Sequence, residues 1–490
     1  MENTLNSLVM PLLYDYEKVP LDYVSQVANI KRILERWTAD PEFEAAFKAN
    51  PAGAIASMGI DVTPEEILPL VDEDHAIRLT QALQANDVSG YPVSVLRYRS
   101  FLAEKMAHRD KTRIESRPTD PRIGTWRDRQ VKRCANELGN AKSDAIVHPF
   151  VSFELSKGCT VGCWFCGVQA PKFDQNWRYT AANAALWQEV LEVTKELLGA
   201  SMHTGFLYWA TDPLDNPDYE RFLTDFSAVT GRCPQTTTAL GVKDVERTRK
   251  LLNHTRILDA QIDRFSVLSL KMLRIIHESF TPVELIKVEC VPQNREAKGR
   301  FLKSNSGRAR NYAVKKAEEL TNGTQGDTIA CVTGFLFNMP DREVKLITPC
   351  QSNEKWPLGY WVIAKATFDT AAELKEILAN MVANHMKTHL VLEDKVALRR
   401  DLKWEATDSN FQLISNHLAT TFHGQQNSLV LLHLLAKGNH SLMELAHLRA
   451  EQDGVPMEET FFLLNDLFHN GFLDEEPELL PEPLIQLSYA

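Results

Sequence analysis

The stretch Glu154-Leu-Ser-Lys-Gly-Cys159-Thr-Val-Gly-Cys163-Trp-Phe-Cys166-Gly167 is the part of the chain that decides its fold. Its three cysteines have C-x3-C-x2-C spacing and directly follow a strand-like run at 150–156. Three thiolates in so short a stretch converge on one inorganic centre only if the loop wraps around that centre. The glycines at 158, 162 and 167 supply the backbone freedom for such a loop.

The spacing of these cysteines differs from that of structural zinc sites, which pair a C-x2-4-C unit with a second Cys or His pair. No such pair follows Cys166. A 4Fe-4S cluster usually has four thiolate ligands, so three cysteines would leave one iron with an open coordination position. The alternative is that the cysteines only pack a core. Structural cysteines, however, occur singly more often than as a triplet in a glycine-containing loop.

At this motif, with the aromatic Phe165 just before the third cysteine, the chain resembles the radical S-adenosylmethionine (radical SAM) superfamily. The resemblance implies that Cys159, Cys163 and Cys166 hold a 4Fe-4S cluster. It also implies that S-adenosylmethionine (SAM) binds nearby, with Phe165 among its contacts, and that the fold is α/β with a partial (β/α)6 barrel.

The pattern from residue 150 onward agrees with such a fold, because strand-like and helix-like runs alternate as in parallel βα units. Strands are predicted at 151–156, 205–210, 235–240, 265–270 and 283–291, and helices at 180–198, 217–229, 243–253 and 271–278. In parallel barrels the chemistry takes place at the carboxyl ends of the strands, and the cysteine triplet follows the first predicted strand.

The predicted SAM contacts follow the later strands. Most members of the superfamily have Gly-Gly-Glu-Pro after the second strand, where this chain has Thr211 and Asp212. The resemblance therefore implies that these two residues bind the amino group of SAM. A helix N-cap is the alternative role of Asp212, although Asp215, just before Pro217, fits that role better. Weaker candidates for SAM contacts are Thr237, Ser269 and Gln293.

The run from Cys331 to Cys350 predicts a β-hairpin. If Phe337 pairs with Arg342, Cys331 falls opposite Thr348, and both cysteines lie at the open end of the hairpin. This looks like a degenerate form of the SPASM or twitch extensions, in which such cysteines ligate a second cluster. No cysteine follows Cys350 and none of the remaining five has C-x2-C spacing, so a complete second cluster is not expected.

A thiol that is released from ligation but stays near the active site can donate a hydrogen atom. Cys350 is the first candidate because it follows a proline at a strand end and precedes a polar, aromatic stretch, and Cys331 is the second. The alternative is that a free cysteine is a small buried hydrophobic residue, which suits Cys134 and Cys290.

Three further strings, 208–219, 234–239 and 356–361, together with the cysteine motif, resemble the radical SAM peptide epimerases of the proteusin type. These enzymes mature ribosomally synthesised peptides. The resemblance implies that a 5'-deoxyadenosyl radical removes the Cα hydrogen of an L-residue and that a cysteine thiol returns hydrogen from the opposite face. It implies two partners, a precursor peptide with a leader region and an external electron donor of the flavodoxin or ferredoxin type.

Two other functions remain open at this point. A radical SAM enzyme that forms carbon–carbon or thioether crosslinks would carry the same cysteine motif, but it would remove two hydrogens from its peptide. A non-enzymatic iron–sulfur redox sensor would not cleave SAM at all.

Four regions are predicted. Residues 1–117 form a helical, leader-like N-terminal region, in which Asp40-Pro41 and a capping box at 63–66 start helices. The partial barrel spans 118–325, where Ser306-Gly307-Arg308 resembles a segment common after the fifth strand. A degenerate SPASM/twitch-like hairpin and helix follow at 326–390, and a helical, winged-helix-like domain at 391–490.

Composition narrows the range of functions. The 490 residues carry 54 basic and 65 acidic side chains, a net charge of -11, which argues against a nucleic-acid partner. A local basic surplus at 97–133 is interpreted as a solvated helical face rather than a docking surface. No run of 18 apolar residues and no secretion signal is visible, so no membrane association and a cytoplasmic location are expected. Eight cysteines suit a reducing compartment.

Overall fold

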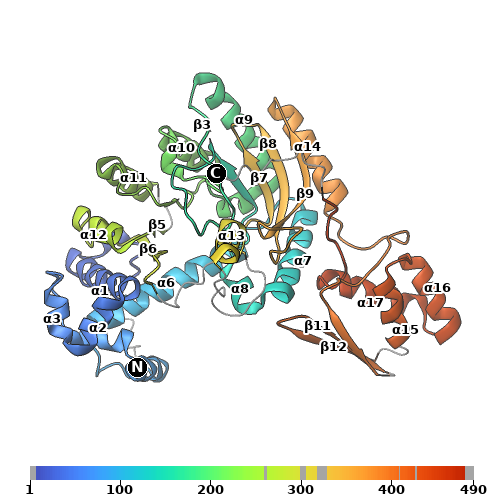
Figure 1. The fold of residues 1–490 in the computed structure, drawn as a ribbon, viewed down its shortest axis with the longest axis horizontal. Helices are drawn as coiled ribbons and strands as arrows, with labels where there is room; N and C mark the ends of the chain where they lie inside the picture. Colours follow the sequence, from blue (N-terminus) through green and yellow to red (C-terminus); the bar gives the residue numbers. More distant parts are fainter. Residues whose placement is uncertain are drawn as a thin grey trace. The chain divides into compact units, whose positions relative to one another are not determined.

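The computed structural model describes residues 7–258, 262–297, 305–316, 328–407, 409–424 and 428–479. The chain divides into two compact units, and each unit combines helices with strands (Figure 1). Unit 1 contains Met1–Glu115, Phe206–Tyr208 and Asp212–Lys303, and unit 2 contains Ser116–Gly205, Trp209–Thr211 and Ser304–Ala490. The protein is therefore a mixed α/β structure. The predicted four-region boundaries remain a prediction.

Unit 1 begins with a group of helices: η1 (Tyr16–Lys18), α1 (Leu21–Ala39), α2 (Pro41–Ala49), α3 (Pro51–Ala56), α4 (Pro64–Val71), α5 (Glu73–Ala85) and α6 (Val93–Glu115). The predicted helix starts are confirmed, because the Asp40 carboxylate accepts from two amides of α2 and Thr63 forms a capping box with Glu66. The second part of unit 1 contains η3 (Pro213–Asp215), α10 (Tyr219–Thr230), β4 (Thr237–Thr238), α11 (Val245–Ile257), β5 (Asp263–Val267), α12 (Leu270–Ser279) and β6 (Val288–Pro292).

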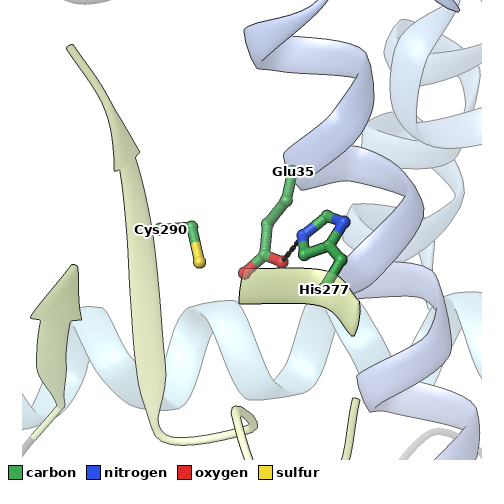
Figure 2. A group of neighbouring side chains, drawn as sticks. All are labelled: Glu35, His277 and Cys290. Carbon is green, nitrogen blue, oxygen red and sulfur yellow. Dashed lines mark hydrogen bonds and ion pairs between the residues drawn. The ribbon is translucent and has the colours of Figure 1, made fainter. Parts of the chain in front are cut away.

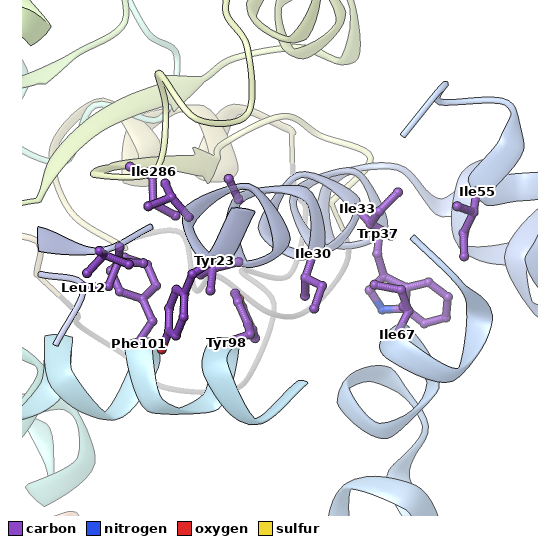
Figure 3. Packing of buried hydrophobic residues seen from close by; sticks show 14 of the residues in the cluster. Leu12, Tyr23, Ile30, Ile33, Trp37, Ile55, Ile67, Tyr98, Phe101 and Ile286 are labelled. Atoms are coloured by element: carbon purple, nitrogen blue, oxygen red, sulfur yellow. The ribbon is translucent and has the colours of Figure 1, made fainter. Parts of the chain in front are cut away.

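One hydrophobic core joins the two parts of unit 1 (Figure 3). Ile30, Ile33 and Trp37 of α1 are buried in this core. Ile286, which follows α12, packs into the same cluster. Burial of apolar side chains stabilises by about 25 cal/mol per Å², so a shared core of this kind couples the stabilities of the two parts.

The strands of unit 1 form a parallel sheet in the order β4-β5-β6. Phe265 of β5 lies opposite Thr238 on one side and Cys290 on the other. The helices α10, α11 and α12 are found close to the predicted ranges, because each shows a clear helical period and a capping residue or a helix-terminating glycine.

Unit 2 begins with α7 (Pro121–Leu138), α8 (Asn140–Ala145), β1 (Val151–Glu154), β2 (Ser156–Lys157), β3 (Gln175–Asn176), α9 (Ala181–Leu198) and η2 (Gly199–Thr204). It continues with α13 (Gly307–Lys316), β7 (Gly334–Asn338), β8 (Glu343–Pro349), β9 (Tyr360–Thr367) and α14 (Ala371–His385). The four-stranded sheet has the order β1-β7-β8-β9, and α14 packs against both β9 and α9 (Figure 1).

The predicted hairpin exists, but its register was predicted wrongly. Phe337 pairs with Val344 rather than with Arg342, and Asn338 pairs with Glu343. Continued past the ladder, this register aligns residue 331 with residue 350 rather than with 348. The hairpin is also no appendage, because β1 runs parallel to β7 in the same sheet.

The partial barrel is only partly visible. Residues 205–210, predicted as the second strand, do not form a β-strand in the structure. They follow the 3-10 helix η2, which ends at Thr204. Within the described ranges, β1 and the β4–β6 group belong to separate sheets rather than to one continuous barrel sheet. The partial (β/α)6 barrel therefore remains a prediction.

The prediction of a helical domain at 391–490 was wrong in part, because this region also contains strands. An antiparallel sheet of β10 (Lys403–Ala406), β11 (Asn410–Ile414) and β12 (Ala419–His423) precedes α15 (Ser428–Lys437), α16 (Leu442–Asp453) and α17 (Met457–His469). The alternation of buried and less buried residues in β11, with Phe411 and Leu413 inside, is the period-two pattern of a half-buried strand. Among the described residues, no helix is both long and apolar enough to cross a membrane.

Candidate cluster-binding loop and donor thiol

The cysteine triplet lies in a loop of unit 2 that β2 and β3 close at its base. Lys157 pairs with Gln175 across this base, and the Cys159 amide donates to the Pro171 carbonyl at 3.0 Å. Gly158 has φ +77°, and a Cβ there would lie 2.2 Å from the Lys172 carbonyl oxygen. Gly162 also has a positive φ, of +64°. The glycine requirement predicted for this loop is therefore confirmed at these two positions.

All three cysteines of the triplet are partly exposed. Burial raises the pKa of the Cys163 thiol to about 12, and the neighbouring Cys166 and Cys159 contribute to this rise. The Ala170 amide points at Cys166 Sγ from 3.3 Å, which is the type of N–H···S contact that tunes iron–sulfur clusters. Soft thiolate ligands in a loop with inward-pointing amides fit a 4Fe-4S cluster, and Cys159, Cys163 and Cys166 would hold it.

Arg308 fixes the shape of this loop, and the sequence had not assigned it a role. Its guanidinium donates to the carbonyl oxygen of Cys163 at 2.7 Å and to that of Ala170, while its amide donates to the Cys166 carbonyl at 2.9 Å. The preceding Gly307 has φ +53°, and a Cβ there would lie 2.4 Å from the Gly167 carbonyl oxygen. The segment 305–308 is therefore in direct contact with the cysteine loop.

The same segment holds the loop that carries Cys350. The Gly307 amide donates to the Pro357 carbonyl at 2.8 Å, and Ser352 Oγ donates to the Asn305 carbonyl at 2.6 Å. Cys350 closes the start of its loop by donating its amide to Gly359 at 3.0 Å. The cysteine triplet and Cys350 are thus connected through four residues of one segment, within one unit of the structure.

Cys350 itself is a buried, protonated thiol. It is 2% exposed and packs with Trp356 and Trp361. Burial raises the pKa of the Cys350 thiol well above its ordinary value, with a further contribution from Glu137. A thiol that keeps its proton is a poor nucleophile and a poor metal ligand, but it retains the S–H bond that hydrogen-atom donation requires.

Beneath Cys350, α7 contributes Arg133, whose side chain is fully buried. Its guanidinium donates to Thr348 Oγ1 at 3.2 Å and to the Pro349 carbonyl at 2.6 Å, and it lies 3.7 Å from the ring centre of Trp361. Glu137, which pairs with Arg133 at 2.6 Å, accepts from the Gln351 amide at 3.1 Å. This ion pair therefore holds the backbone on both sides of Cys350.

With this geometry in place, the chain can be compared with known proteins. The uncharacterized protein y4wI of Sinorhizobium fredii is 37% identical over 463 residues, covering 92% of this chain and 88% of that protein. The chain belongs to the y4wI family. No protein-family model matches it. A crystal structure of BtrN in complex with AdoMet and 2-DOIA matches at a TM-score of 0.28 and 14% identity, over 40% of this chain and 71% of that chain. Similarity at this level does not establish a shared fold.

In this member of the y4wI family, the predicted SAM contacts are divided between the units. Thr211 belongs to unit 2, as do Phe165 and the cysteine triplet, whereas Asp212 belongs to unit 1. The other predicted contacts in unit 1 are Thr237, Ser269 and Gln293. The SAM-binding role of these residues remains a prediction.

Asp212 already has three partners within unit 1. Its carboxylate accepts from Thr238 Oγ1 and the Ala239 amide, both at 2.7 Å, and from the Leu214 amide at 3.0 Å. Asp212 is therefore the N-cap of η3, and the expectation that Asp215 fits a capping role better was wrong. Burial raises the pKa of the Asp212 carboxyl to about 6.

The remaining candidates have local partners too. Ser269 caps α12 by accepting from the Met272 amide at 3.1 Å, and the Thr237 hydroxyl lies 2.7 Å from the Tyr208 hydroxyl. The Gln293 amide donates to Val267 at 2.8 Å, which extends the pairing of β5 with β6. The side-chain contacts of Ser269 and Thr237 explain why a hydroxyl residue stands at each of these two positions.

Glu154 is a titratable residue next to the cysteine loop that sequence reasoning missed. It ends β1, and its carboxylate accepts from the Ala210 amide at 2.8 Å. Burial raises the pKa of the Glu154 carboxyl to about 7, and this is larger than the opposing effect of the Ala210 hydrogen bond. The sequence signal was an acidic residue at the end of a short predicted strand, just before the cysteine loop.

Unit 1 contains a second group of potential metal ligands, Glu35, His277 and Cys290 (Figure 2). Their ligand atoms all lie within 4.8 Å of one another. However, Glu35 already pairs with Lys31 and with His277 Nε2 at 3.1 Å. Despite desolvation, which raises it, these partners lower the pKa of the Glu35 carboxyl to about 2. A metal ion here would share the site with the buried cations of Lys31 and Arg32, so the group is best explained as an ion-pair network that joins α1 to α12 and β6.

Proposed function

We propose that this protein is a radical SAM enzyme that converts L-residues to D-residues in a ribosomally synthesised precursor peptide. The observation that carries the proposal is the arrangement in unit 2, where segment 305–308 contacts both the loop of the cysteine triplet and the loop of Cys350. Inversion at Cα needs a source of a radical and a separate hydrogen donor. The first loop carries the three cysteines that suit a cluster, and the second carries Cys350, a thiol that suits hydrogen donation.

Each residue has a defined task in this proposal. Cys159, Cys163 and Cys166 would hold a 4Fe-4S cluster, and the cluster with SAM would supply the radical that takes the Cα hydrogen. Cys350 then gives a hydrogen atom to the opposite face of the planar Cα radical, and the thiyl radical left on its sulfur takes an electron from the external electron donor and a proton from solvent before the next turnover. Its buried position keeps the thiol protonated, and the ion pair of Arg133 and Glu137 fixes its backbone.

The decisive experiment is an anaerobic reaction in deuterated water with the cluster-loaded protein, SAM, a chemical reductant and precursor peptides encoded beside the gene. Solvent deuterium exchanges into the Cys350 thiol, so each inverted residue gains one deuterium at Cα and appears as a D-residue after hydrolysis. Loss of two hydrogens from the peptide would show a crosslinking enzyme instead. Absence of deoxyadenosine with every peptide would favour a redox sensor.

A further inference from the structure

The loop of Cys350 is covered by an acidic segment at 474–478, which follows α17. Glu476 Oε1 accepts from the indole nitrogen of Trp356 at 2.7 Å and pairs with Lys355 Nζ at 2.9 Å. Trp356 is only 5% exposed and belongs to the same small buried cluster as Cys350 and Trp361. The carboxylate of Glu476 therefore holds one of the two rings in the cluster that buries the thiol.

The anchor of this segment is a neighbouring residue. Glu475 accepts from Arg129 through two parallel bonds, Nε to Oε2 at 2.8 Å and Nη2 to Oε1 at 2.9 Å. Bidentate Arg–carboxylate pairs are among the stronger ion pairs, and this Arg129 side chain is 1% exposed. By contrast, Glu476 uses one oxygen, Oε1, for both Trp356 Nε1 and Lys355 Nζ, and its side chain is 29% exposed against 22% for Glu475. The bonds of Glu476 can therefore break while Glu475 still holds the segment on Arg129.

The two sides of Cys350 also differ in how firmly they are held. On the α7 side, Arg133 is fully buried and donates to the Thr348 hydroxyl and to the Pro349 carbonyl. On the other side, the Trp356 ring is held by packing and by the bond to Glu476. A thiol that is 2% exposed cannot meet a peptide Cα, so access requires movement, and the Trp356 side is the one that can move.

We propose that Glu476 and Trp356 form a latch over Cys350, and that a peptide substrate reaches the thiol when the indole leaves the carboxylate. This proposal deepens the proposed function, on which it rests for the identity of the ligand. The latch itself is a property of the resting protein and can be measured without cluster chemistry, SAM or peptide.

The test is anaerobic pulse labelling of the full-length protein with a neutral maleimide, followed by trypsin digestion and mass spectrometry. Cys350 is the only cysteine of the tryptic peptide 346–355, and Cys134 is the only cysteine of the peptide 134–142. Cys134 is fully buried on α7, where its Sγ donates to the Pro349 carbonyl at 3.1 Å, so its labelling reports loosening of the α7 side of Cys350 rather than opening on the Trp356 side.

Glu476→Ala and Trp356→Phe are each expected to raise the labelling rate of Cys350 about tenfold or more, because each removes a hydrogen bond to a charged group. The rate of Cys134 should stay unchanged. The double variant should label Cys350 no faster than the faster single variant, since both changes break the same contact. Glu478→Ala is the matched control, an exposed carboxylate of the same segment, and should leave both rates at the wild-type value.

Equal acceleration of Cys350 and Cys134 would mean that the variants loosen the whole unit, and the latch would be wrong. Wild-type labelling of Cys350 in both single variants would also overturn it. Failure of the deuterium experiment, in contrast, would remove the epimerase assignment and leave the labelling result unaffected, so the two proposals fail separately.

Discussion

At the scale of single residues, the chemistry assigned to Cys350 depends on its sulfur. Cys350→Ala should still produce deoxyadenosine in the presence of peptide, because the cysteine triplet is untouched, but it should fail to install D-residues. The readout is the ratio of D-residues to deoxyadenosine, which should fall at least 100-fold if no other donor replaces the thiol, or about 3 kcal/mol in the barrier at 1.4 kcal/mol per tenfold.

Cys331→Ala serves as the control for this variant, since Cys331 is the second candidate donor and is partly exposed. It should invert residues as the wild type does. If Cys350→Ala also inverts normally, the donor role moves to Cys331 or Cys290, and the assignment made from burial is wrong.

Arg308 gives a second prediction at this scale. Arg308→Lys keeps the charge but cannot donate to the Cys163 and Ala170 carbonyls together, because the planar fork of the guanidinium is lost. Less iron and sulfide should remain bound per chain after reconstitution and gel filtration, with a loss of about 1–3 kcal/mol for the missing charged hydrogen bond.

The control for Arg308→Lys is Arg310→Lys, on the same helix. Its guanidinium makes no hydrogen bond or ion pair with the residues that the structure describes, so its exchange should leave the iron content unchanged. Equal losses from both variants would assign the effect to α13 as a whole.

The glycine-dependent loop that carries the cysteine triplet could be predicted because its constraints are local. Arg133 could not, because an arginine on an amphipathic helix is normally solvated, and its partner Thr348 is 215 positions further along the chain. Nothing in a single sequence indicates such a pairing. The same applies to Glu476 and Trp356, which are 120 positions apart.

At the scale of elements, the start of α13 carries a further prediction. Gly307→Ala would place a Cβ 2.4 Å from the Gly167 carbonyl oxygen, at a φ of +53°. Both the clash and the left-handed backbone cost free energy, so unit 2 should lose about 2–4 kcal/mol of stability. The urea midpoint of the full chain measures this loss.

Gly454→Ala separates the two causes, because Gly454 ends α16 with φ +68° and nothing lies within 4 Å of its Cβ position. Only the backbone cost of about 1 kcal/mol is expected there. If both variants lower the midpoint equally, the contact between Gly307 and the cysteine loop does not contribute.

The helices were predictable because period and capping act over a few residues, as α9 to α12 show. The hairpin register was not, because Arg342 adopts φ +49° at the end of the turn, a left-handed conformation that no sequence rule expects of arginine. Arg342 is therefore part of the turn, and the partner of Phe337 is Val344, two positions later than predicted. The strands β10–β12 were missed because they are short, at four or five residues each, and only one of them, β11, alternates clearly between buried and less buried residues around an apolar pair.

At the scale of the whole molecule, the basic surplus at 97–133 proves to be largely used internally. Lys105 pairs with Glu289, Arg117 with Asp128 and Arg129 with Glu475. These contacts argue against a docking surface, but the predicted solvated face is wrong for part of the stretch, because the Arg129 and Arg133 side chains are 1% and 0% exposed. The division of the predicted barrel strands between two units could not be predicted from the sequence. Alternating strands and helices do not show which strands share a sheet.

The stability of the molecule should also depend on pH through a buried carboxyl in unit 1. Burial raises the pKa of Asp263 to about 7, despite its hydrogen bonds to the Thr236 amide and Thr255 Oγ1. The folded state therefore keeps a proton that the unfolded chain releases near pH 4. Its contribution is complete below that pH and is lost as pH rises through about 7.

Asp263→Asn should flatten this dependence, because the amide stays neutral and retains an oxygen that can accept from the Thr236 amide. Urea unfolding near pH 5 and near pH 7 measures this dependence. The free energy of unfolding should differ less between the two pH values in the variant than in the wild type, by an amount on the order of a few kcal/mol at about 1.4 kcal/mol per pKa unit. Asp22→Asn, at an exposed position on α1, should leave the wild-type dependence in place. A variant whose midpoints still fall toward pH 7 as in the wild type would transfer the effect to Glu154, the carboxyl in unit 2 whose pKa burial also raises to about 7.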